Sequence, residues 1–402
     1  MRLKVAFRNV LRNKRRTLLN VFMIAGGVSA LIVFNSFILS VINGLRDITI
    51  KTQTGHLQVA TPLYWEKTAK SPKESLMPDY ARVQKRISRH PRVRSASGRL
   101  TFYGLISKGE NSTSAQGMSF DPTAEGSLNR NFKFDVGRGF ESPKAYELAL
   151  GSPLAKRLGI KVGDRVTVLA NTFDGVVNAL DLQVVGIFTT AVAMVDERTF
   201  IIPLKLAQKL MDTDKVEQIV VNLKDTNETD SVLAFLKKEL GNNLEVRPWY
   251  VVSTLYQQVQ DFNSVQNSVL EIIILSLILL GILNTIGMSV FERTGEIGTV
   301  AALGEPSRSI LIQFVLEGGI LGFLGSLAGV LLGMVLTYII NSLKIPLVMP
   351  GATMPLIIYL HFYVRAFVEA GLLSVIAGTL AAIVPAYRAS RMNIANALRH
   401  NI

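Results

Sequence analysis

The sequence has 402 residues, of which 49% are hydrophobic and only 18% are charged, and it contains no cysteine. A soluble protein usually carries about a quarter charged residues, so the composition indicates a membrane protein, and the missing cysteines exclude disulfides and cysteine-ligated metals. The histidines are far apart and have no ligand-like spacing, which argues against a catalytic metal: His56, His90, His361 and His400.

The net charge of +13 does not indicate a nucleic-acid partner, because of where the charge lies. Residues 1–17 contain seven basic residues and no acidic one, directly before the first apolar segment. Basic residues beside a membrane span mark its cytoplasmic side. Their apolar residues recur at helical spacing, with arginines on another face. We therefore predict a cytoplasmic amphipathic helix over 1–17 that lies at the surface of the lipid bilayer.

Four apolar segments are each long enough to cross a bilayer, which takes about 20 residues. They are predicted at 18–42, 269–291, 309–343 and 364–387. The first lacks the short apolar core and cleavage site of a signal peptide, so we expect it to be retained. Pro385 is expected to kink or end the fourth. Arg365 and Glu369 are one helical turn apart and are expected to pair.

The basic ends of the chain predict its orientation. The N-terminal segment is strongly positive, and the tail over 388–402 contains arginines and no acidic residue. Both termini are thus expected in the cytoplasm of a bacterium, with the chain in the inner membrane. With four spans, residues 43–268 and the short segment 344–363 then lie outside the cytoplasm, and 292–308 forms a cytoplasmic loop.

The large outer segment is predicted to fold as an α+β domain. Strand patterns occur at 165–169, 180–188, 200–202 and 218–223, and helical patterns at 79–88, 204–211 and 229–240. The middle, about 99–225, is rich in strands, whereas the flanks, about 55–98 and 226–250, carry helices. We expect two lobes, one of them built from both flanks.

Two further helical patterns are predicted to extend spans out of the membrane. Residues 35–46 continue the first span, and the polar segment 257–267 leads directly into the second. Such helices would act as stalks that join the outer domain rigidly to the membrane.

No motif of an enzyme active site is present in the sequence. It contains no GxxxxGK[ST] phosphate-binding loop, no GxSxG elbow and no HExxH helix. We therefore predict no catalytic residue, no bound cofactor and no metal ligand in this chain, and we expect that it does not hydrolyse ATP by itself.

The third span carries glycines at four-residue spacing along one helix face. Small residues on such a face let helix backbones approach closely within lipid. Two interpretations are open: packing within one subunit, or an interface that either meets a second subunit or moves. The residues are Gly318, Gly322, Gly325, Gly329 and Gly333. Glu317 precedes this face and is either an ordinary carboxylate at the membrane interface or a contact to a partner.

The loop 292–308 is too short for a domain and too regular for a flexible linker. Its pattern predicts one or two helical turns with an exposed apolar edge, and three glutamates against two arginines make it unusually acidic for a cytoplasmic loop. A docking surface for another protein explains this best. The candidate contact residues are Glu292, Arg293, Glu296, Ile297, Val300, Ala302, Leu303 and Gly304.

Residues 292–304 also resemble a family signature, E-R-x-x-E-I-G-x-x-x-A-L-G, of permeases related to FtsX, which include MacB and the lipoprotein-release permeases LolC and LolE. Residues 8–17 look like the family's opening R-N-l-x-R-x-x-x-R-T, and 43–45 (NGL) resemble the NGF of lipoprotein-release permeases. Residues 154–166 with 185–188 look like the family's outer lobe, and 385–399 resemble its ending. Two departures are Ile394 in place of the usual proline and the lack of a fused nucleotide-binding domain.

This resemblance implies a fold and a mechanism. The fold is four transmembrane helices with a large α+β extracytoplasmic domain of the MacB-like periplasmic type. A separate ABC ATPase dimer, which binds ATP and Mg²⁺, would dock on the 292–308 loops of two permeases. The second permease is another copy of this chain or a homologue. Movement would pass through the stalks to the outer domains, an arrangement called mechanotransmission.

Three functions are compatible with the resemblance. The first is the permease subunit that couples the ATPase to lipoprotein release from the inner membrane. The alternatives are a MacB-like export permease that works with outer-membrane partners on periplasmic substrates, and an FtsX-like regulator of a cell-wall hydrolase. The NGL motif and the missing ATPase domain favour the first.

Overall fold

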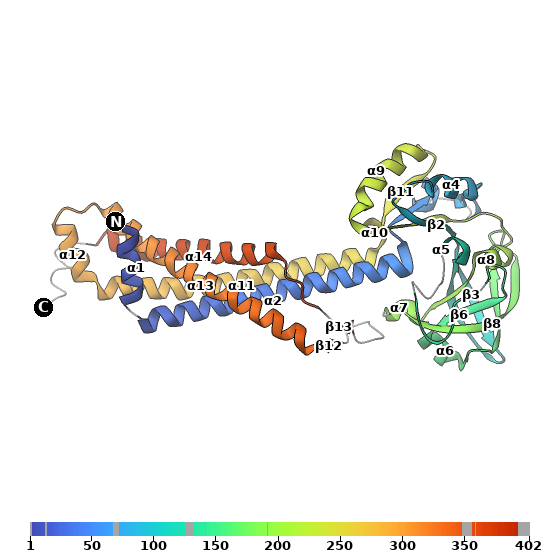
Figure 1. The fold of residues 1–402 in the computed structure, drawn as a ribbon, viewed down its shortest axis with the longest axis horizontal. Coiled ribbons are helices and arrows are strands. Elements are labelled where there is room, and N and C mark those ends of the chain that lie inside the picture. The colour runs from blue at the N-terminus through green and yellow to red at the C-terminus, as the bar shows by residue number, and fades with distance from the viewer. Residues whose placement is uncertain are drawn as a thin grey trace. The chain divides into compact units, whose positions relative to one another are not determined.

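The computed structural model describes residues 2–12, 14–66, 72–125, 132–140, 142–190, 192–347, 356–357 and 359–392. The chain divides into two compact units, a helical unit and a sheet unit (Figure 1). The helical unit comprises Met1–Ile42, Val259–Ile345 and Ile357–Ile402, and the sheet unit comprises Asn43–Gln258 and Pro346–Leu356. The predicted tail beyond Met392, which includes Ile394, lies outside the described residues, as do residues 348–355 and 358 of the predicted segment 344–363.

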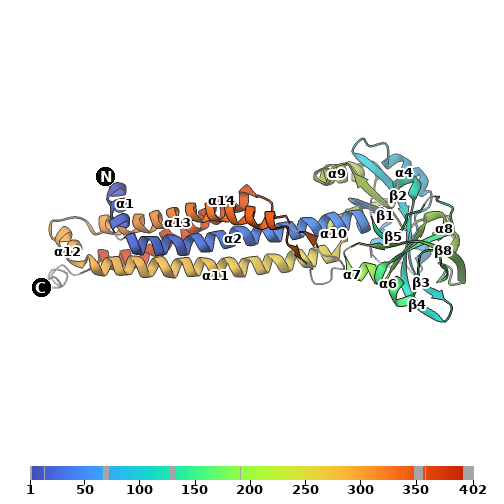
Figure 2. The same ribbon diagram turned by 60° about the horizontal axis from the view of Figure 1, so that its bottom comes forward.

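Four long helices make up most of the helical unit. They are α2 (Lys14–Thr49), α11 (Thr254–Glu292), α13 (Ser307–Leu343) and α14 (Val364–Ser390), and two shorter ones are α1 (Arg2–Arg12) and α12 (Thr294–Ala302). Both views show the long helices side by side (Figure 2). Within the described residues, these four helices are long and apolar enough to cross a membrane. They cover the four predicted spans, and both predicted helical extensions lie within α2 and α11.

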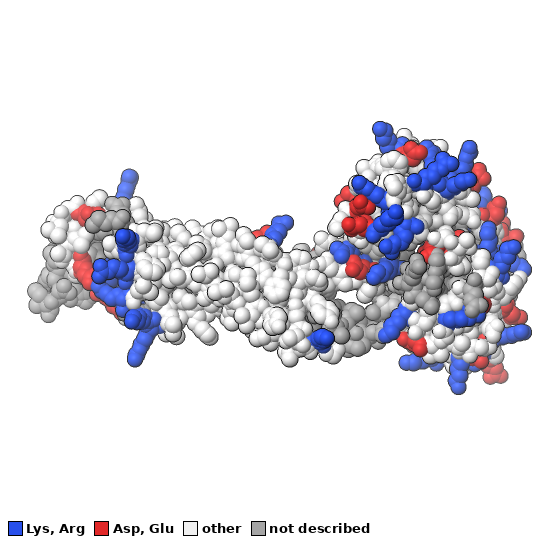
Figure 3. All heavy atoms as spheres, viewed as in Figure 1, with Lys and Arg blue, Asp and Glu red and all other residues white. Residues whose placement is uncertain are grey.

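The surface of the helical unit fits a lipid environment. Large apolar side chains such as Leu280, Phe323 and Leu372 are more than half exposed, as expected for residues that face acyl chains rather than water. On the face of the bundle that Figure 3 shows, Lys, Arg, Asp and Glu are few along the helices and gather at the end that carries α1 and α12.

Two predictions about the fourth span can be compared with α14. Arg365 Nε contacts Glu369 Oε1 at 2.7 Å, which confirms the predicted pair. Helix α14 continues through Pro385 to Ser390, so the prediction that Pro385 ends the helix is wrong. Ala382, Ala386 and Ala389 on this part of the helix are buried in the bundle, and this packing offsets the backbone hydrogen bond that proline cannot donate.

The sheet unit contains two sheets. The smaller is antiparallel, with the order β11-β1-β10-β2. Its strands are β1 (Leu57–Ala60), β2 (Val93–Arg99), β10 (Gln218–Leu223) and β11 (Glu245–Pro248). Helices α4 (Tyr80–Ile87) and α9 (Thr229–Leu240) pack against β2 and β11. As predicted, residues from both flanks form one lobe.

The larger sheet has seven strands in the order β5-β8-β6-β9-β4-β3-β7, and β7 also pairs with β8. This last pairing closes six of the strands into a barrel, with β5 beside β8. The strands are β3 (Thr101–Lys108), β4 (Asn111–Phe120), β5 (Lys133–Gly137), β6 (Glu147–Gly151), β7 (Arg165–Asn171), β8 (Val177–Thr189) and β9 (Thr199–Pro203). In β7, Val166, Val168 and Ala170 alternate inward.

Short helices complete the described structure. They are η1 (Ile50–Thr54), α3 (Pro62–Glu66), η2 (Pro72–Ser75), α5 (Pro122–Glu125), α6 (Ser152–Leu158), α7 (Ala193–Asp196), α8 (Leu204–Leu210), η4 (Thr226–Glu228) and α10 (Trp249–Val252), with the small pair β12 (Pro346–Leu347) and β13 (Leu356–Ile357). The predicted strands and helices of the outer domain coincide with β7, β8, β9, β10, α4, α8 and α9.

The division into lobes differs from the prediction in two ways. The flanks contribute strands β1, β2 and β11 as well as helices, and β10 leaves the strand-rich middle to join them. Strand β1 is buried at all four positions, so it lacks the alternation that identifies a strand from sequence. One hydrophobic core, with Leu57 and Val221 from the small sheet and Phe200 and Val168 from the large one, runs through both sheets.

A buried ion pair holds α5 against β2 of the smaller sheet. Arg99 Nη2 contacts Glu125 Oε2 at 2.9 Å, and the two side chains are 5% and 2% exposed. Ser97 Oγ also donates to Glu125 Oε1 at 2.6 Å. Removal of one partner of such a pair leaves an uncompensated buried charge.

We expect Glu125→Gln to lower the free energy of unfolding of the sheet unit by about 3 kcal/mol. Thermal unfolding of the purified protein, followed by circular dichroism, measures the effect. Glu239→Gln is the matched control, because it breaks the half-exposed pair of Glu239 with Arg86 and should cost no more than about 1 kcal/mol. Equal effects of the two variants would contradict this expectation.

A second carboxyl group should make stability depend on pH. Burial raises the pKa of Glu217 to about 7, although the backbone N–H of Thr101 donates to Glu217 Oε2 at 2.7 Å. The folded state therefore keeps this proton at pH values where the unfolded chain has lost it. Stability from this group should fall as pH rises from about 4.5 to about 7 and then stay constant, with a total of roughly 3 kcal/mol. Glu217→Gln should remove this part of the pH dependence in unfolding curves measured across that range.

Candidate functional site: the charged network around helix α12

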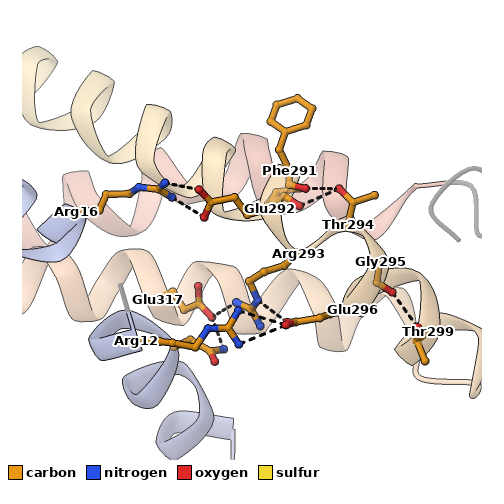
Figure 4. Close-up of polar contacts among 12 residues, drawn as sticks. Arg12, Arg16, Phe291, Glu292, Arg293, Thr294, Gly295, Glu296, Thr299 and Glu317 are labelled. Carbon is orange, nitrogen blue, oxygen red and sulfur yellow. Dashed lines mark hydrogen bonds and ion pairs between the residues drawn. The ribbon is translucent and has the colours of Figure 1, made fainter. Parts of the chain in front are cut away.

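Helix α12 is a separate short helix between α11 and α13. The Thr294 hydroxyl donates to the carbonyl oxygens of Val290 at 3.1 Å and Phe291 at 2.8 Å, and so satisfies carbonyls at the end of α11 (Figure 4). At the other end of α12, Gly304 has a φ of +91°, a conformation that glycine adopts without strain, and Pro306 precedes α13. The predicted short helix in this loop is present.

One face of α12 is buried and the other is exposed. Thr294, Ile297 and Gly298 are buried against the bundle, and Ile297 belongs to its hydrophobic core. Val300 is 43% exposed, and Leu303, just after the helix, is 83% exposed. The sequence placed Ile297 on the exposed apolar edge; that assignment is wrong, because the helix phase turns this side chain inward.

The core of the site is a buried carboxylate. Glu317, on α13, is 3% exposed. Its Oε1 accepts a hydrogen bond from Asn9 Nδ2 at 2.7 Å and one from Arg293 Nη1 at 3.0 Å. The Arg293 guanidinium also lies over the ring of Phe314, 5.4 Å from its centroid. Glu317 therefore joins α1 and the start of α12 to α13, within this chain.

The same arginine extends the network to the surface. Arg293 Nε donates to Glu296 Oε2 at 3.1 Å, and Arg12 Nη2 reaches Glu296 Oε1 at 3.3 Å (Figure 4). The hydrogen bond from Arg293, and next the one from Arg12, hold the pKa of Glu296 below its ordinary value. Glu296 thus stays ionised at neutral pH and ties α12 to α1.

A second ion pair joins α2 to α11. Arg16 donates to both oxygens of Glu292, with Nη1–Oε2 at 3.0 Å and Nη2–Oε1 at 2.5 Å, the two-pronged geometry in which arginine binds a carboxylate most strongly. One turn further along α2, Asn20 Oδ1 accepts a hydrogen bond from the Thr285 hydroxyl at 2.9 Å. The two helices are therefore held in register next to the site.

The eight candidate contact residues consequently divide into two groups. Glu292, Arg293 and Glu296 are engaged in ion pairs within the chain, and Ile297 is buried. The exposed group is Val300, Ala302, Leu303 and Gly304. We call this group the apolar edge.

The sequence did not single out Asn9, Arg12 and Arg16 as parts of the site. All three lie in the basic N-terminal segment, whose charge pattern indicates membrane topology and gives no sign of these contacts. The one available signal was the arginine and asparagine spacing in the N-terminal family motif.

The glycine face of α13 packs against helices of the same chain. A Cβ atom on Gly318 would lie 2.5 Å from Ala382 Cβ on α14, and one on Gly325 or Gly329 would lie 2.5 or 2.6 Å from Cβ of Ile24 or Val28 on α2. Gly322 faces Ser374 and Val375, and Gly333 faces Ile32. These contacts within the chain favour the interpretation of the five glycines as a packing face of one subunit.

Within the described residues, no group of three or more His, Asp or Glu side chains is arranged to hold a metal ion. The charged groups around α12 form ion pairs with one another, and these pairs attach neighbouring helices to each other.

Two protein families match this chain in consecutive parts. The MacB-like periplasmic core domain matches residues 17–239, and the FtsX-like permease C-terminal region matches residues 268–394. The chain belongs to the MacB/FtsX-like ABC transporter permeases. Helix α12 and Glu317 lie within the FtsX-like region, and the sheet unit of this permease lies largely within the MacB-like region. Permeases of this family work with a cytoplasmic ATPase.

Individual relatives of this permease are more distant. An uncharacterized ABC transporter permease of Methanocaldococcus jannaschii is 29% identical over 53% of this chain and 53% of its own length. The lipoprotein-releasing system transmembrane protein LolC of Xylella fastidiosa is 25% identical over 64% of this chain and 66% of its own. The macrolide export ATP-binding/permease protein MacB of Nitrobacter winogradskyi is 28% identical over 50% of this chain and 30% of its own. The aligned part thus spans about half to two thirds of the first two relatives.

Proposed function

We propose that this permease couples the nucleotide cycle of a separate ATPase dimer to the release of lipoproteins from the bacterial inner membrane. The exposed apolar edge of α12, on a helix fixed by ion pairs, is the observation that carries the proposal. An apolar side chain as exposed as Leu303, beside a rigid charged network, suits a contact with another protein rather than with water.

The proposed topology puts the termini and α12 in the cytoplasm and the sheet unit in the periplasm. The basic α1 supports this orientation through the positive-inside rule. The net negative charge of residues 292–308 is cancelled by Arg12 and Arg16, which pair with Glu296 and Glu292, so the α12 end of the bundle as a whole is not acidic. This removes the apparent conflict between an acidic loop and a cytoplasmic location.

The proposed mechanism transmits force through helix ends that are bonded to one another. An ATPase that closes on ATP and Mg²⁺ would move the apolar edge of α12. Because Arg293 and Glu296 connect α12 to α13 and α1, the movement would reach both helices together. A second permease, either a copy or a homologue, would receive the other ATPase subunit.

We favour lipoprotein release over export because the relatives LolC and LolE are named as transmembrane proteins of a lipoprotein-releasing system. The relative MacB is instead named as an ATP-binding/permease protein. Export in the manner of MacB is the second candidate, since the MacB-like core domain covers most of the sheet unit.

Reconstitution separates the two candidates. The permease and its ATPase are placed in nanodiscs with a fluorescent triacylated lipoprotein and a soluble carrier protein. We expect transfer of the lipoprotein to the carrier on addition of ATP and none with a non-hydrolysable analogue. Absence of transfer, together with co-purification of an adaptor and an outer-membrane channel, would replace lipoprotein release by export.

A further inference from the structure

A groove of about 690 Å³ lies in the helical unit between α1 on one side and α13 and α14 on the other. Helix α1 is seated on the bundle by Ala6 and Val10, which are buried. Leu3 and Phe7, on its neighbouring face, are 64% and 45% exposed and line the groove. The groove is thus open, and an amphipathic helix forms one of its walls.

The wall and floor from α13 and α14 are almost entirely apolar. Phe323 on α13 lines the groove and is 57% exposed, and Thr379 is the one polar side chain that α14 contributes to the lining. Gly319 widens the floor, because a Cβ there would lie 3.2 Å from Thr379 Oγ1. Such a lining accepts a hydrocarbon chain and offers almost nothing to a polar ligand.

Two cations stand at the rim of this apolar space. Lys4 and Arg8 are one turn apart on α1, so they share a face, and both are exposed groove residues. No ion pair of either is found among the described residues. Arg12, one turn further on, is in contrast paired with Glu296. Two positive charges therefore lie at the rim of the apolar groove.

We propose that this groove binds an anionic phospholipid, with one acyl chain against α13 and α14 and the phosphate held by Lys4 and Arg8. Charge complementarity and the apolar lining both fit this occupant, and lysine and arginine near a membrane surface attract anionic headgroups. The site goes beyond the proposed function, and its existence does not depend on it.

The lipid would also affect the α12 site. The helix that holds its headgroup carries Asn9 and Arg12, which bind Glu317 and Glu296. A bound anionic lipid fixes α1 on the bundle and thereby stabilises both contacts. This regulatory consequence, unlike the binding itself, rests on the proposed function.

Fluorescence quenching in vesicles tests the binding directly. Phe323→Trp places a tryptophan in the groove, and the native Trp65 and Trp249 lie in the sheet unit, so the parent protein supplies their background. One vesicle sample contains brominated phosphatidylglycerol with ordinary phosphatidylcholine, and the other contains brominated phosphatidylcholine with ordinary phosphatidylglycerol. Quenching of the tryptophan fluorescence in each sample measures binding of the brominated lipid at the groove. We expect phosphatidylglycerol to bind at the groove at least about five-fold more strongly than phosphatidylcholine, since each basic side chain contributes about that factor.

Matched variants make the result specific. Lys4→Gln/Arg8→Gln should bring the ratio of phosphatidylglycerol binding to phosphatidylcholine binding at the groove close to one. Lys14→Gln/Arg15→Gln removes the same charge from exposed residues at the start of α2 and should leave this binding ratio high. Leu280→Trp on the lipid-facing side of α11 should report a ratio near one in the parent protein.

Three results would overturn the proposal. Equal ratios at Trp positions 323 and 280 would mean ordinary boundary lipid only. A high ratio that survives loss of both Lys4 and Arg8 would show that other groups attract the headgroup. Quenching at position 280 but none at 323 would show that protein, such as a second copy of the chain, fills the groove. The assay contains no ATPase, so its failure is distinguishable from failure of the proposed function.

Discussion

We expect Leu303→Glu to reduce permease-dependent stimulation of the partner ATPase by at least about 30-fold. Leu303 is 83% exposed in the isolated chain, so the substitution removes no packing from the permease itself. In the docked complex, loss of a buried leucine costs about 2 kcal/mol, and a desolvated carboxylate costs more. ATPase rates of the reconstituted complex and pull-down of the ATPase by the permease both measure the effect.

Two further variants serve as controls for Leu303→Glu. Leu303→Ala should give an intermediate loss, since it removes apolar area without adding charge. Val176→Glu changes an exposed valine in the sheet unit and should leave stimulation unchanged. If Leu303→Glu stimulates the ATPase normally, the apolar edge of α12 is not the docking surface.

Glu317→Ala should uncouple the permease while leaving its docking edge intact. The substitution removes the acceptor of both Asn9 and Arg293, and Glu296 remains as the carboxylate partner of the Arg293 side chain, which is 13% exposed. Loss of one member of a buried ion pair costs about 3–5 kcal/mol. We expect a lower unfolding temperature, retained binding of the ATPase, and loss of most ATP-driven substrate release.

A double substitution separates the effect of the unpaired Arg293 charge from the effect of the lost hydrogen bonds. Glu317→Gln/Arg293→Gln removes both charges and keeps groups that can hydrogen-bond, so it should recover much of the stability that Glu317→Ala loses. If Glu317→Ala abolishes ATPase binding as completely as Leu303→Glu, then Glu317 contributes to docking rather than to the positioning of α12.

The architecture of the chain was largely predictable from sequence, because long apolar segments and family motifs are strong signals. The arrangement of the site was not. Asn9 and Glu317 are 308 positions apart in the sequence, and no local pattern relates them. Arg293 reads as a surface residue in a charged loop, yet the turn between α11 and α12 directs its guanidinium into the bundle.

The glycines of α13 illustrate the same limit. Their spacing predicted a close helix contact, and the contact exists, but spacing does not name the partner. Two different helices use the face in turn: α14 contacts Gly318 and Gly322, and α2 contacts the three glycines that follow. Strand β1 was missed for a different reason, because a strand buried on both faces has no period to detect.

The contact between Asn9 and Glu317 makes the first helix an integral member of the bundle and not a detachable anchor. A shortened protein that begins at Lys14 would keep the four long apolar helices and could still insert into a bilayer. It would also lose Asn9 and Arg12, leaving both Glu317 and Glu296 to Arg293 alone. Correct insertion into a bilayer therefore does not show that the charged network around α12 is intact. The presence of residues 2–12, which form α1, is a better criterion.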